Sequence, residues 1–200
     1  MVVTGGVAAG KTTFCQFFQQ AVGAVVVFDC DACVHDLLTR GDIKDRLRAE
    51  FGDAVFASNH EVDRSSLGRI VFEDADSRRI LEGILHPEVL KRCLEARESA
   101  LHAGEAPVFL ADVPLFYEVE FSLGEDLVVV VAASRSIRVR RLMERGVPDE
   151  DYAERIISTQ LPLKDKINRA DRVLWNESDV RALRRQVHYL ASLEIEEYGK

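Results

Sequence analysis

The sequence predicts a three-layer α/β fold in which a parallel central sheet lies between helices. Short apolar runs alternate with amphipathic stretches along the chain, which is typical of right-handed βαβ units. The runs are unbroken rather than alternating, as expected of strands buried on both faces. Two long stretches, residues 32–103 and 135–169, have helical periodicity and exceed an ordinary crossover, so we expect them to be helical insertions.

Five apolar runs are the expected strands, and three of them end at a polar residue. The runs are Met1–Thr4, Val25–Phe28 followed by Asp29, Pro107–Ala111 followed by Asp112, Leu127–Ala133, and Val173–Trp175 followed by Asn176. After the first run, Phe14, Phe17, Phe18 and Ala21 recur at the spacing of a helix that faces the core. Open parallel sheets bind their ligands beyond the carboxyl ends of the strands, where these polar residues are expected.

The composition excludes several classes of protein. The chain carries 26 basic and 34 acidic residues, giving a net charge of -8 and a pI of about 5.2. Nucleic-acid binders and membrane-surface proteins need a basic excess. No apolar run approaches the roughly 18–20 residues that span a bilayer, and no secretory signal is visible. We expect a cytoplasmic protein with neither nucleic-acid nor membrane partners.

The cysteines do not indicate a disulfide framework in a chain of this length. Cys30 and Cys33 form a C-x2-C pair, which elsewhere is half of a zinc site or a redox pair. The sequence has no second pair to complete a tetrahedral zinc site. We interpret both as small residues buried where a strand passes into a helix.

The first glycine-rich segment matches the phosphate-binding pattern G-x4-G-K-[ST] over Gly5–Thr12. It follows an apolar run and opens an amphipathic helix, the context that the pattern requires. We expect the nucleotide to contact Gly6, Val7, Ala8, Ala9, Gly10, Lys11, Thr12 and Thr13. Lys11 would reach the β- and γ-phosphates and the Thr12 hydroxyl would bind Mg²⁺. The alternative is a glycine-rich turn before a structural helix.

A chain of 200 residues with helical insertions after its second and fourth strands favours a small-molecule kinase with the P-loop NTPase fold. The D-x-x-G and N-K-x-D segments of GTPases are absent from the sequence. We expect a single domain whose core comprises residues 1–31, 104–134 and 170–200. The insertion over residues 32–103 would bind the acceptor, and residues 135–169 would form a lid over ATP.

Asp29-Cys30-Asp31 follows the second strand and is the expected reaction centre. A carboxylate there faces the γ-phosphate held by the loop and accepts the proton of an attacking hydroxyl. The alternative is that an aspartate, best placed at Asp31, only caps a helix beginning at Ala32. We favour catalysis because the strand end lies at the expected site.

Several segments, in order along nearly the whole chain, resemble the dephospho-coenzyme A kinase family. They are Asp29–His35, Val62–Phe72, Leu81–Pro87, Asp112–Glu118, Arg155–Gln160, Lys166 and Ala170–Asn176. The resemblance implies transfer of the ATP γ-phosphate to the ribose 3′-hydroxyl of dephospho-coenzyme A, the last step of coenzyme A biosynthesis. It also implies that Asp31 is the general base.

The other candidate residues each have a structural alternative. Arg141 and Arg145 lie four apart on one helix and are candidates for ATP phosphate contacts, whereas we expect Arg135, Arg138 and Arg140 to be solvated. The candidates for acceptor binding are Asp31, His35, Arg64, Arg69, His86, Asp112 and Pro114. Both histidines are also expected to be hydrogen-bonded structural residues, with His86-Pro87 starting a helix. Asp112 would hold Mg²⁺ through water, together with Thr12, and the alternative is that its carboxylate accepts hydrogen bonds from nearby backbone amides.

Two other functions remain open at this point. One is another P-loop kinase, such as a nucleoside kinase, which acceptor-dependent ADP formation would distinguish. The other is a regulatory module that binds ATP without transferring phosphate. The sequence leaves the oligomeric state open.

Overall fold

The computed structural model describes residues 1–103, 108–119 and 123–198. Its strands are β1 (Val2–Gly5), β2 (Val25–Asp29), β3 (Val108–Asp112), β4 (Val128–Ala132) and β5 (Arg172–Trp175). Its helices are α1 (Lys11–Val22), α2 (Cys30–Leu37), α3 (Gly41–Phe51), the 3-10 helix η1 (Gly52–Val55), α4 (Arg64–Glu73), α5 (Ala75–Ala103), α6 (Arg135–Glu144), α7 (Glu150–Ser158), α8 (Leu163–Asn168) and α9 (Val180–Tyr198). The five predicted strands are confirmed, apart from Pro107, which lies outside the described residues.

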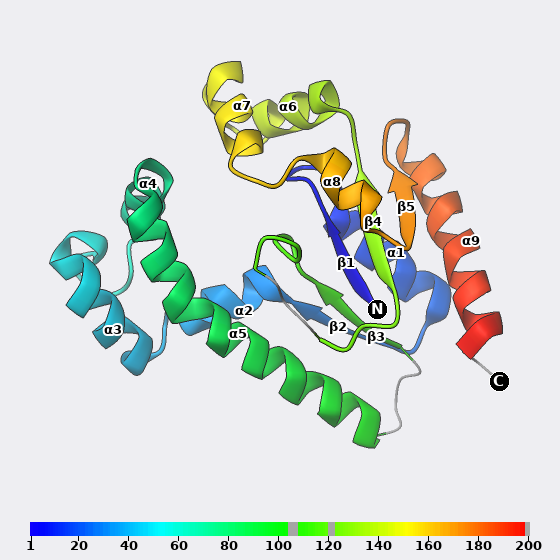
Figure 1. Ribbon diagram of the computed structural model, residues 1–200, viewed down its shortest axis with the longest axis horizontal. Helices are drawn as coiled ribbons and strands as arrows, with labels where there is room; N and C mark the ends of the chain where they lie inside the picture. Colours follow the sequence, from blue (N-terminus) through cyan, green and yellow to red (C-terminus); the bar gives the residue numbers. More distant parts are fainter. Residues whose placement is uncertain (104–107, 120–122, 199–200) are drawn as a thin grey trace. The chain divides into compact units, whose positions relative to one another are not determined.

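The described strands form one parallel sheet with the order β2-β3-β1-β4-β5 (Figure 1). β1 is the central strand, and its Val3 lies in register with Asp112 of β3. Its last residue, Gly5, lies in register with Val131 of β4. The predicted parallel sheet is therefore confirmed. Because β1 is central, the glycine-rich segment that follows it lies at the middle of the carboxyl edge of the sheet.

Helices cover both faces of the sheet. α1 and α9 pack against each other and against the sheet, whereas α8 lies against β4 on the opposite face (Figure 1). The main core joins side chains of the strands to those of α1 and α9: Val3, Phe14, Phe18, Leu110, Val129, Val131, Leu174, Leu183 and Val187. Phe14 and Phe18 stack with their ring centroids 5.7 Å apart. The predicted aromatic stripe of α1 is thus confirmed as core.

The chain packs as two compact units. One comprises residues 1–29 and 96–200 and contains the whole sheet with α1 and α6–α9. The other comprises residues 30–95 and contains α2, α3, η1, α4 and most of α5. In the part of residues 32–106 that the structure describes there is no sheet strand, as predicted, only an isolated bridge between Phe56 and Val62.

Two helix starts differ from the prediction. β2 passes directly into α2, which begins at Cys30 rather than Ala32, so Asp31 lies in its first turn and not at the position before it. His86-Pro87 does not start a helix either, because Pro87 lies inside α5. Proline removes a backbone hydrogen bond from a helix. Ile84, Leu85 and Val89 around it are buried, and we attribute the continuity of α5 to their packing.

Cys30 and Cys33 are both buried, which agrees with the interpretation of these residues as small buried side chains. Across the described part of the chain, no helix combines the length and the apolarity needed to cross a membrane.

Candidate nucleotide site

The predicted nucleotide contacts lie in the loop between β1 and α1 and in the first turn of α1. β1 ends at Gly5, and Lys11, Thr12 and Thr13 lie in the first turn of α1. Gly10 precedes the helix with a φ of 106°, a conformation that glycine adopts without strain. The first turn of a helix directs its N–H groups and its positive dipole end outward, which favours a bound phosphate. The loop therefore has the local structure of an anion site.

Three glycines of this loop lie so close to other segments that an added Cβ would displace a neighbouring atom. A Cβ added to Gly5 would lie 2.2 Å from the Val131 carbonyl oxygen. A Cβ on Gly6 would lie 2.7 Å from Nη1 of Arg138, and one on Gly10 would lie 2.3 Å from Nδ2 of Asn176. The glycines of the motif thus allow other segments of the protein to approach the loop closely.

Arg141 and Asn176 hold the loop by its carbonyl groups. Nη1 of Arg141 donates hydrogen bonds to the carbonyls of Ala8 and Ala9, each at 3.2 Å. Its Nη2 donates to the Asn176 carbonyl at 3.0 Å, and Nδ2 of Asn176 donates to the Ala9 carbonyl at 2.8 Å. The predicted ATP contact Arg141 therefore lies at the loop, where it binds backbone oxygens.

The helices of the predicted lid segment also contact the loop. Ala8 packs in an apolar cluster with Val139 and Leu142 of α6 and with Ala153 and Ile157 of α7. In the segment after α7, the Gln160 side-chain oxygen accepts a hydrogen bond from the Val7 N–H at 2.8 Å. The loop is therefore anchored on residues 135–169 at several points.

The interpretation of Arg138 as a solvated residue was wrong. Arg138 is only 6% exposed, and its Nε donates to the Ala133 carbonyl at 3.1 Å. α6 begins three residues after β4, and this short connection directs the face bearing Arg138 onto the loop. The helical charge pattern alone did not show which of the five arginines faces inward.

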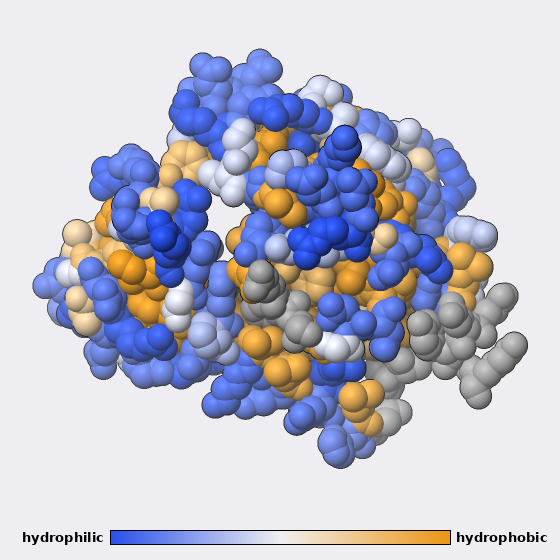
Figure 2. All heavy atoms as spheres, in the orientation of Figure 1, coloured by the Kyte–Doolittle hydropathy of each residue, from blue (hydrophilic) through white to orange (hydrophobic). Residues whose placement is uncertain are grey.

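Arg135 and Arg140 are exposed, as predicted, and pair with acidic residues of the surface. Arg135 pairs with Glu154, and Arg140 lies 3.7 Å from Glu144. Figure 2 shows a mainly hydrophilic surface over α6 and α7. Arg145 is also exposed, at the carboxyl end of α6.

Buried positive charge surrounds the loop. Burial lowers the pKa values of Arg138 and Arg141 below the ordinary value of an arginine. Burial also lowers the pKa of Lys166, and the positive charges of Lys11 and Arg138 act in the same direction. Clustered cations with lowered pKa values favour the binding of an anion.

Two carboxylates lie beside the loop at the carboxyl edge. Asp29 and Asp112 lie in register at the ends of β2 and β3, and Asp112 is 8% exposed. The buried Cys15 thiol lies 3.9 Å from Oδ2 of Asp112. Burial raises the pKa of this thiol, Asp112 and Asp29 raise it further, and Lys11 lowers it. The charges of three predicted functional groups thus act on one buried thiol, and two of these groups, Asp29 and Asp112, lie at neighbouring strand ends.

Pro114, a predicted acceptor contact, belongs to the turn after β3. Its carbonyl accepts hydrogen bonds from Oγ1 of Thr4 at 3.2 Å and from Nζ of Lys166 at 3.1 Å. This turn is thus fixed to β1 and α8. The carbonyl of Pro114 is already engaged within the protein.

The remaining predicted acceptor residues belong to the unit of residues 30–95. Asp31 is exposed in the first turn of α2. Nη1 of Arg64 lies 2.7 Å from Nδ1 of His35, within hydrogen-bond distance. The structure brings these two together, whereas Arg69 is exposed on α4 and His86 is half-buried in α5. α4 begins at the cap Asp63, whose carboxylate accepts from the N–H groups of Ser65 and Ser66.

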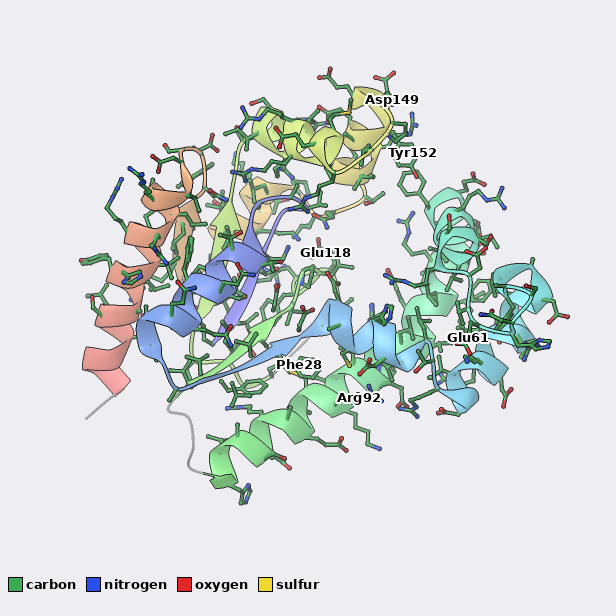
Figure 3. The ribbon with its side chains drawn as sticks, turned by 180° about the vertical axis from the view of Figure 1, so that it is seen from behind. Phe28, Glu61, Arg92, Glu118, Asp149 and Tyr152 are labelled. Atoms are coloured by element: carbon green, nitrogen blue, oxygen red, sulfur yellow. The ribbon has the colours of Figure 1, made fainter. Side chains whose placement is uncertain are left out.

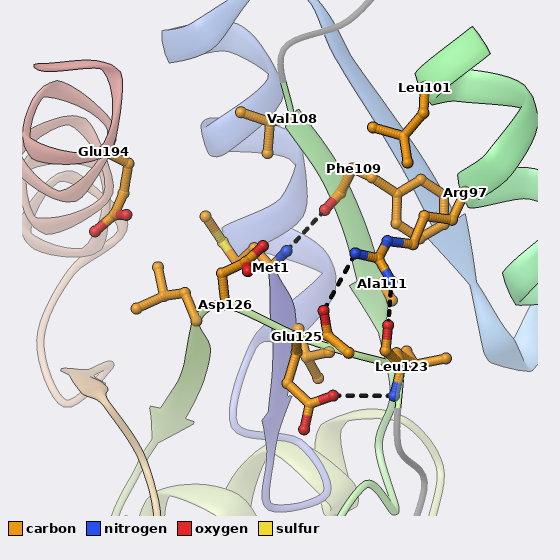
Figure 4. A pocket seen from close by; sticks show the side chains of 13 residues that line it. Met1, Arg97, Leu101, Val108, Phe109, Ala111, Leu123, Glu125, Asp126 and Glu194 are labelled. Atoms are coloured by element: carbon orange, nitrogen blue, oxygen red, sulfur yellow. Dashed lines mark hydrogen bonds between the residues drawn. The ribbon is translucent and has the colours of Figure 1, made fainter. Parts of the chain in front are cut away.

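A cavity of about 150 Å³ lies at the opposite, amino-terminal edge of the sheet (Figure 4). Met1 and Phe109 line it, and the Met1 amino group donates to the Phe109 carbonyl at 3.0 Å. None of the predicted functional residues lines this cavity. It plays no part in the nucleotide site.

Sequence reasoning assigned no role to five residues that hold the loop or its surroundings. These are Glu118, Arg138, Gln160, Lys166 and Asn176. All except Arg138 lie in segments that carry the family resemblance. The family resemblance therefore pointed to four of these residues. It did not show which residues they contact, because their partners are distant in the chain.

Over nearly its whole length, the chain is similar to known proteins. The sequence profile of the dephospho-CoA kinase family matches residues 1–182. A dephospho-CoA kinase of Bacillus licheniformis is 35% identical over 189 residues, which are 94% of this chain and 92% of that protein.

Two solved structures share the fold. A crystal structure from Thermus thermophilus has a TM-score of 0.78 and 29% identity, covering 96% of this chain and 95% of that one. A dephospho-CoA kinase from Campylobacter jejuni has a TM-score of 0.67 and 23% identity, covering 100% and 98% of the two chains. With the parallel sheet and the phosphate loop, these matches show that the chain belongs to the dephospho-CoA kinase family.

Proposed function

We propose that this chain transfers the γ-phosphate of ATP to the ribose 3′-hydroxyl of dephospho-CoA, giving coenzyme A. The observation that carries the proposal is the loop Gly5–Thr12, held at the carboxyl edge of the sheet in a chain of this family. The family relatives are kinases by name, and the loop has the geometry that a nucleotide phosphate needs.

Phosphoryl transfer depends on positioning the acceptor in line and on stabilising charge on the γ-phosphate oxygens. Lys11, at the start of α1, supplies charge to the β- and γ-phosphates. Arg141 supports the loop from its carbonyl side with its guanidinium 3.2 Å from Ala8 and Ala9. Arg145, exposed at the carboxyl end of the same helix, would contact the nucleotide phosphates from the predicted lid segment.

Thr12 and Asp112 fit a divalent cation. Thr12 offers an exposed hydroxyl in the first turn of α1, and Asp112 offers a carboxylate at the end of β3. Oxygen ligands of this kind, completed by nucleotide phosphates, are those that Mg²⁺ prefers. When bound there, Mg²⁺ would neutralise charge on the phosphate oxygens.

On the acceptor side, Asp31 accepts the proton of the attacking hydroxyl. Support for this role comes from its exposure and from its place two residues beyond the carboxyl end of β2. Arg64 and Arg69 would bind phosphate groups of the acceptor, and the hydrogen bond to His35 would orient Arg64. His86 completes the proposed acceptor contacts.

Mass spectrometry of the product after incubation with ATP, Mg²⁺ and dephospho-CoA tests the proposal. We expect coenzyme A from the wild-type protein and a loss of at least about a hundredfold in rate for Lys11→Ala. Lys164→Ala, which removes an exposed lysine of α8, serves as the matched control and should keep the rate. ATP binding without any phosphorylated product would instead indicate a regulatory module.

A further inference from the structure

An ion pair between the buried Lys166 and the partly exposed Glu118 lies against the start of the phosphate loop and has no part in the proposed chemistry. Lys166 of α8 is 0% exposed. Its Nζ lies 2.7 Å from Oε1 of Glu118 and donates to the carbonyls of Pro114 at 3.1 Å and Gly5 at 3.4 Å. Three acceptors thus match the three donors of the ammonium group.

The pair joins three segments that are distant in the chain. Glu118 lies on the turn after β3 (Figure 3), and its Oε1 also accepts from the Leu161 N–H at 2.9 Å. Leu161 directly follows Gln160, which binds the Val7 N–H. The pair therefore connects the start of the loop, the turn after β3, and the segment between α7 and α8.

Stability alone does not account for this arrangement. Burying the Lys166 charge beside Glu118, whose side chain is 19% exposed, has a desolvation cost, and apolar residues of similar volume often replace such pairs without loss of stability. What apolar side chains cannot supply is a directed hydrogen bond to the Gly5 carbonyl. That carbonyl belongs to the residue where β1 ends and the loop begins.

The contacts on Gly5 come from two sides. A Cβ on this glycine would lie 2.2 Å from the Val131 carbonyl oxygen, so β4 closes one side of the residue. Lys166 holds its carbonyl oxygen. The direction in which the chain leaves β1 is thereby set, and with it the orientation of the loop N–H groups.

We propose that Lys166, held by Glu118, is a positioning residue that orients the phosphate loop for ATP without touching the nucleotide. The proposal rests on nucleotide binding by this loop, as in the proposed function, but not on the identity of the acceptor. It requires that the loss of the pair weakens the binding of ATP more than that of the acceptor.

The test replaces the pair as a unit. Lys166→Met/Glu118→Met removes both charges and avoids leaving one of them buried without its partner. We expect a KM for ATP and a Kd for ADP raised at least about tenfold. The KM for dephospho-CoA should stay within about twofold of the wild-type value. Lys164→Met, which changes an exposed lysine on the same helix, is the matched control and should leave both KM values unchanged.

A second variant covers the case in which the double variant fails to fold. Glu118→Gln keeps the volume and the oxygen acceptor but weakens the pair, and we expect a rise of about threefold or more in the KM for ATP. A simple loss of folded protein would lower the measured kcat and leave that KM unchanged. Folded variants with wild-type ATP constants would overturn the inference. Failure of the proposed function would show differently, as wild-type protein that forms no coenzyme A, in which case the Kd for ADP still tests the inference.

Discussion

Asp31 lies in the first turn of α2, and its carboxylate has two conceivable effects there. A negative charge near a helix N-terminus stabilises the helix by about 0.3–1 kcal/mol. The same carboxylate, two residues beyond the end of β2, is placed to accept a proton from the acceptor hydroxyl. Because α2 begins at Cys30, a side-chain cap by Asp31 does not account for this residue.

Asp31→Asn separates the two effects. Asparagine removes the charge and the proton acceptor, and loss of a general base typically costs about 10²–10⁴ in rate. We expect a melting temperature close to that of the wild type, unchanged ATP binding, and phosphate transfer at least about a hundredfold slower. The measurements are a thermal melt and a coupled ADP-release assay, with the exposed Asp36→Asn of the same helix as control. If Asp31→Asn transferred phosphate at the wild-type rate and Asp29→Asn did not, the general base would be Asp29 instead.

His86 provides a pH-dependent prediction. Burial lowers its pKa below the ordinary 6.5, while Glu82 acts in the opposite direction. The unfolded state therefore binds a proton at a higher pH than the folded state, and stability falls as the pH falls from 6.5 through the folded pKa. Urea unfolding at about pH 7.5 and about pH 5 should show a smaller loss of stability for His86→Gln than for the wild type.

The exposed His188→Gln is the control for this measurement and should behave as the wild type. An equal loss of stability in His86→Gln and in the wild type would mean that burial does not perturb this imidazole. The role of His86 would then have to be sought in the acceptor alone.

At the scale of elements, the phosphate loop depends on three segments that approach it closely. β4 approaches Gly5, α6 approaches Gly6, and the residue after β5 approaches Gly10. A Cβ at Gly5 would meet the backbone of β4, whereas a Cβ at Gly6 or Gly10 would displace the side chain of Arg138 or Asn176. The motif glycines are therefore explained by these neighbours as well as by the phosphate that the loop is expected to bind.

Gly10→Ala tests this explanation. The φ of 106° is strained for alanine, and the new Cβ would lie 2.3 Å from Nδ2 of Asn176. We expect the free energy of unfolding to fall by about 1–3 kcal/mol, together with weaker binding of ATP. Chemical denaturation and calorimetric titration measure the two effects.

Gly68→Ala in α4 is the matched control, because a Cβ there has no neighbour within 4 Å. In a helix interior alanine is favoured over glycine, so this variant should gain about 0.4–1 kcal/mol. Equal effects of the two substitutions would refute the claim that Gly10 is constrained by Asn176 and by its backbone conformation.

At the scale of the whole molecule, the predicted residues divide between the two compact units. The nucleotide residues Gly6–Thr13, with Arg141 and Arg145, belong to the unit of residues 1–29 and 96–200. Of the predicted acceptor residues, Asp31, His35, Arg64, Arg69 and His86 belong to the unit of residues 30–95, whereas Asp112 and Pro114 belong to the same unit as the nucleotide residues. This division supports the proposal that the two substrates are bound mainly by different parts of the chain.

Acceptor specificity follows from that proposal. Adenosine carries a 3′-hydroxyl but lacks the pantetheine-bearing end of dephospho-CoA. If the unit of residues 30–95 binds that end, this remote binding energy lowers the barrier to transfer. We expect kcat/KM for adenosine to be lower than for dephospho-CoA by at least about a hundredfold. Steady-state assays with both acceptors measure it, and equal values would favour a nucleoside kinase.

The sequence by itself determined the strands, the phosphate loop and the family. The unbroken apolar runs predicted β1 to β5 because a buried parallel strand needs apolar side chains on both faces. Gly5–Thr12 predicted the loop because the motif lies within one short stretch of chain. Both features are local, and local patterns can be read without knowing which segments meet.

Only the tertiary structure decided which charged side chains face inward. Arg138 and Arg135 share one helix and one residue type, but the short connection from β4 buries the first and leaves the second in solvent. Lys166 meets Gly5, 161 positions earlier in the chain, and Asn176 meets Ala9, 167 positions earlier. Contacts over such separations depend on how the sheet is ordered and how its helices pack, so no local pattern specifies them.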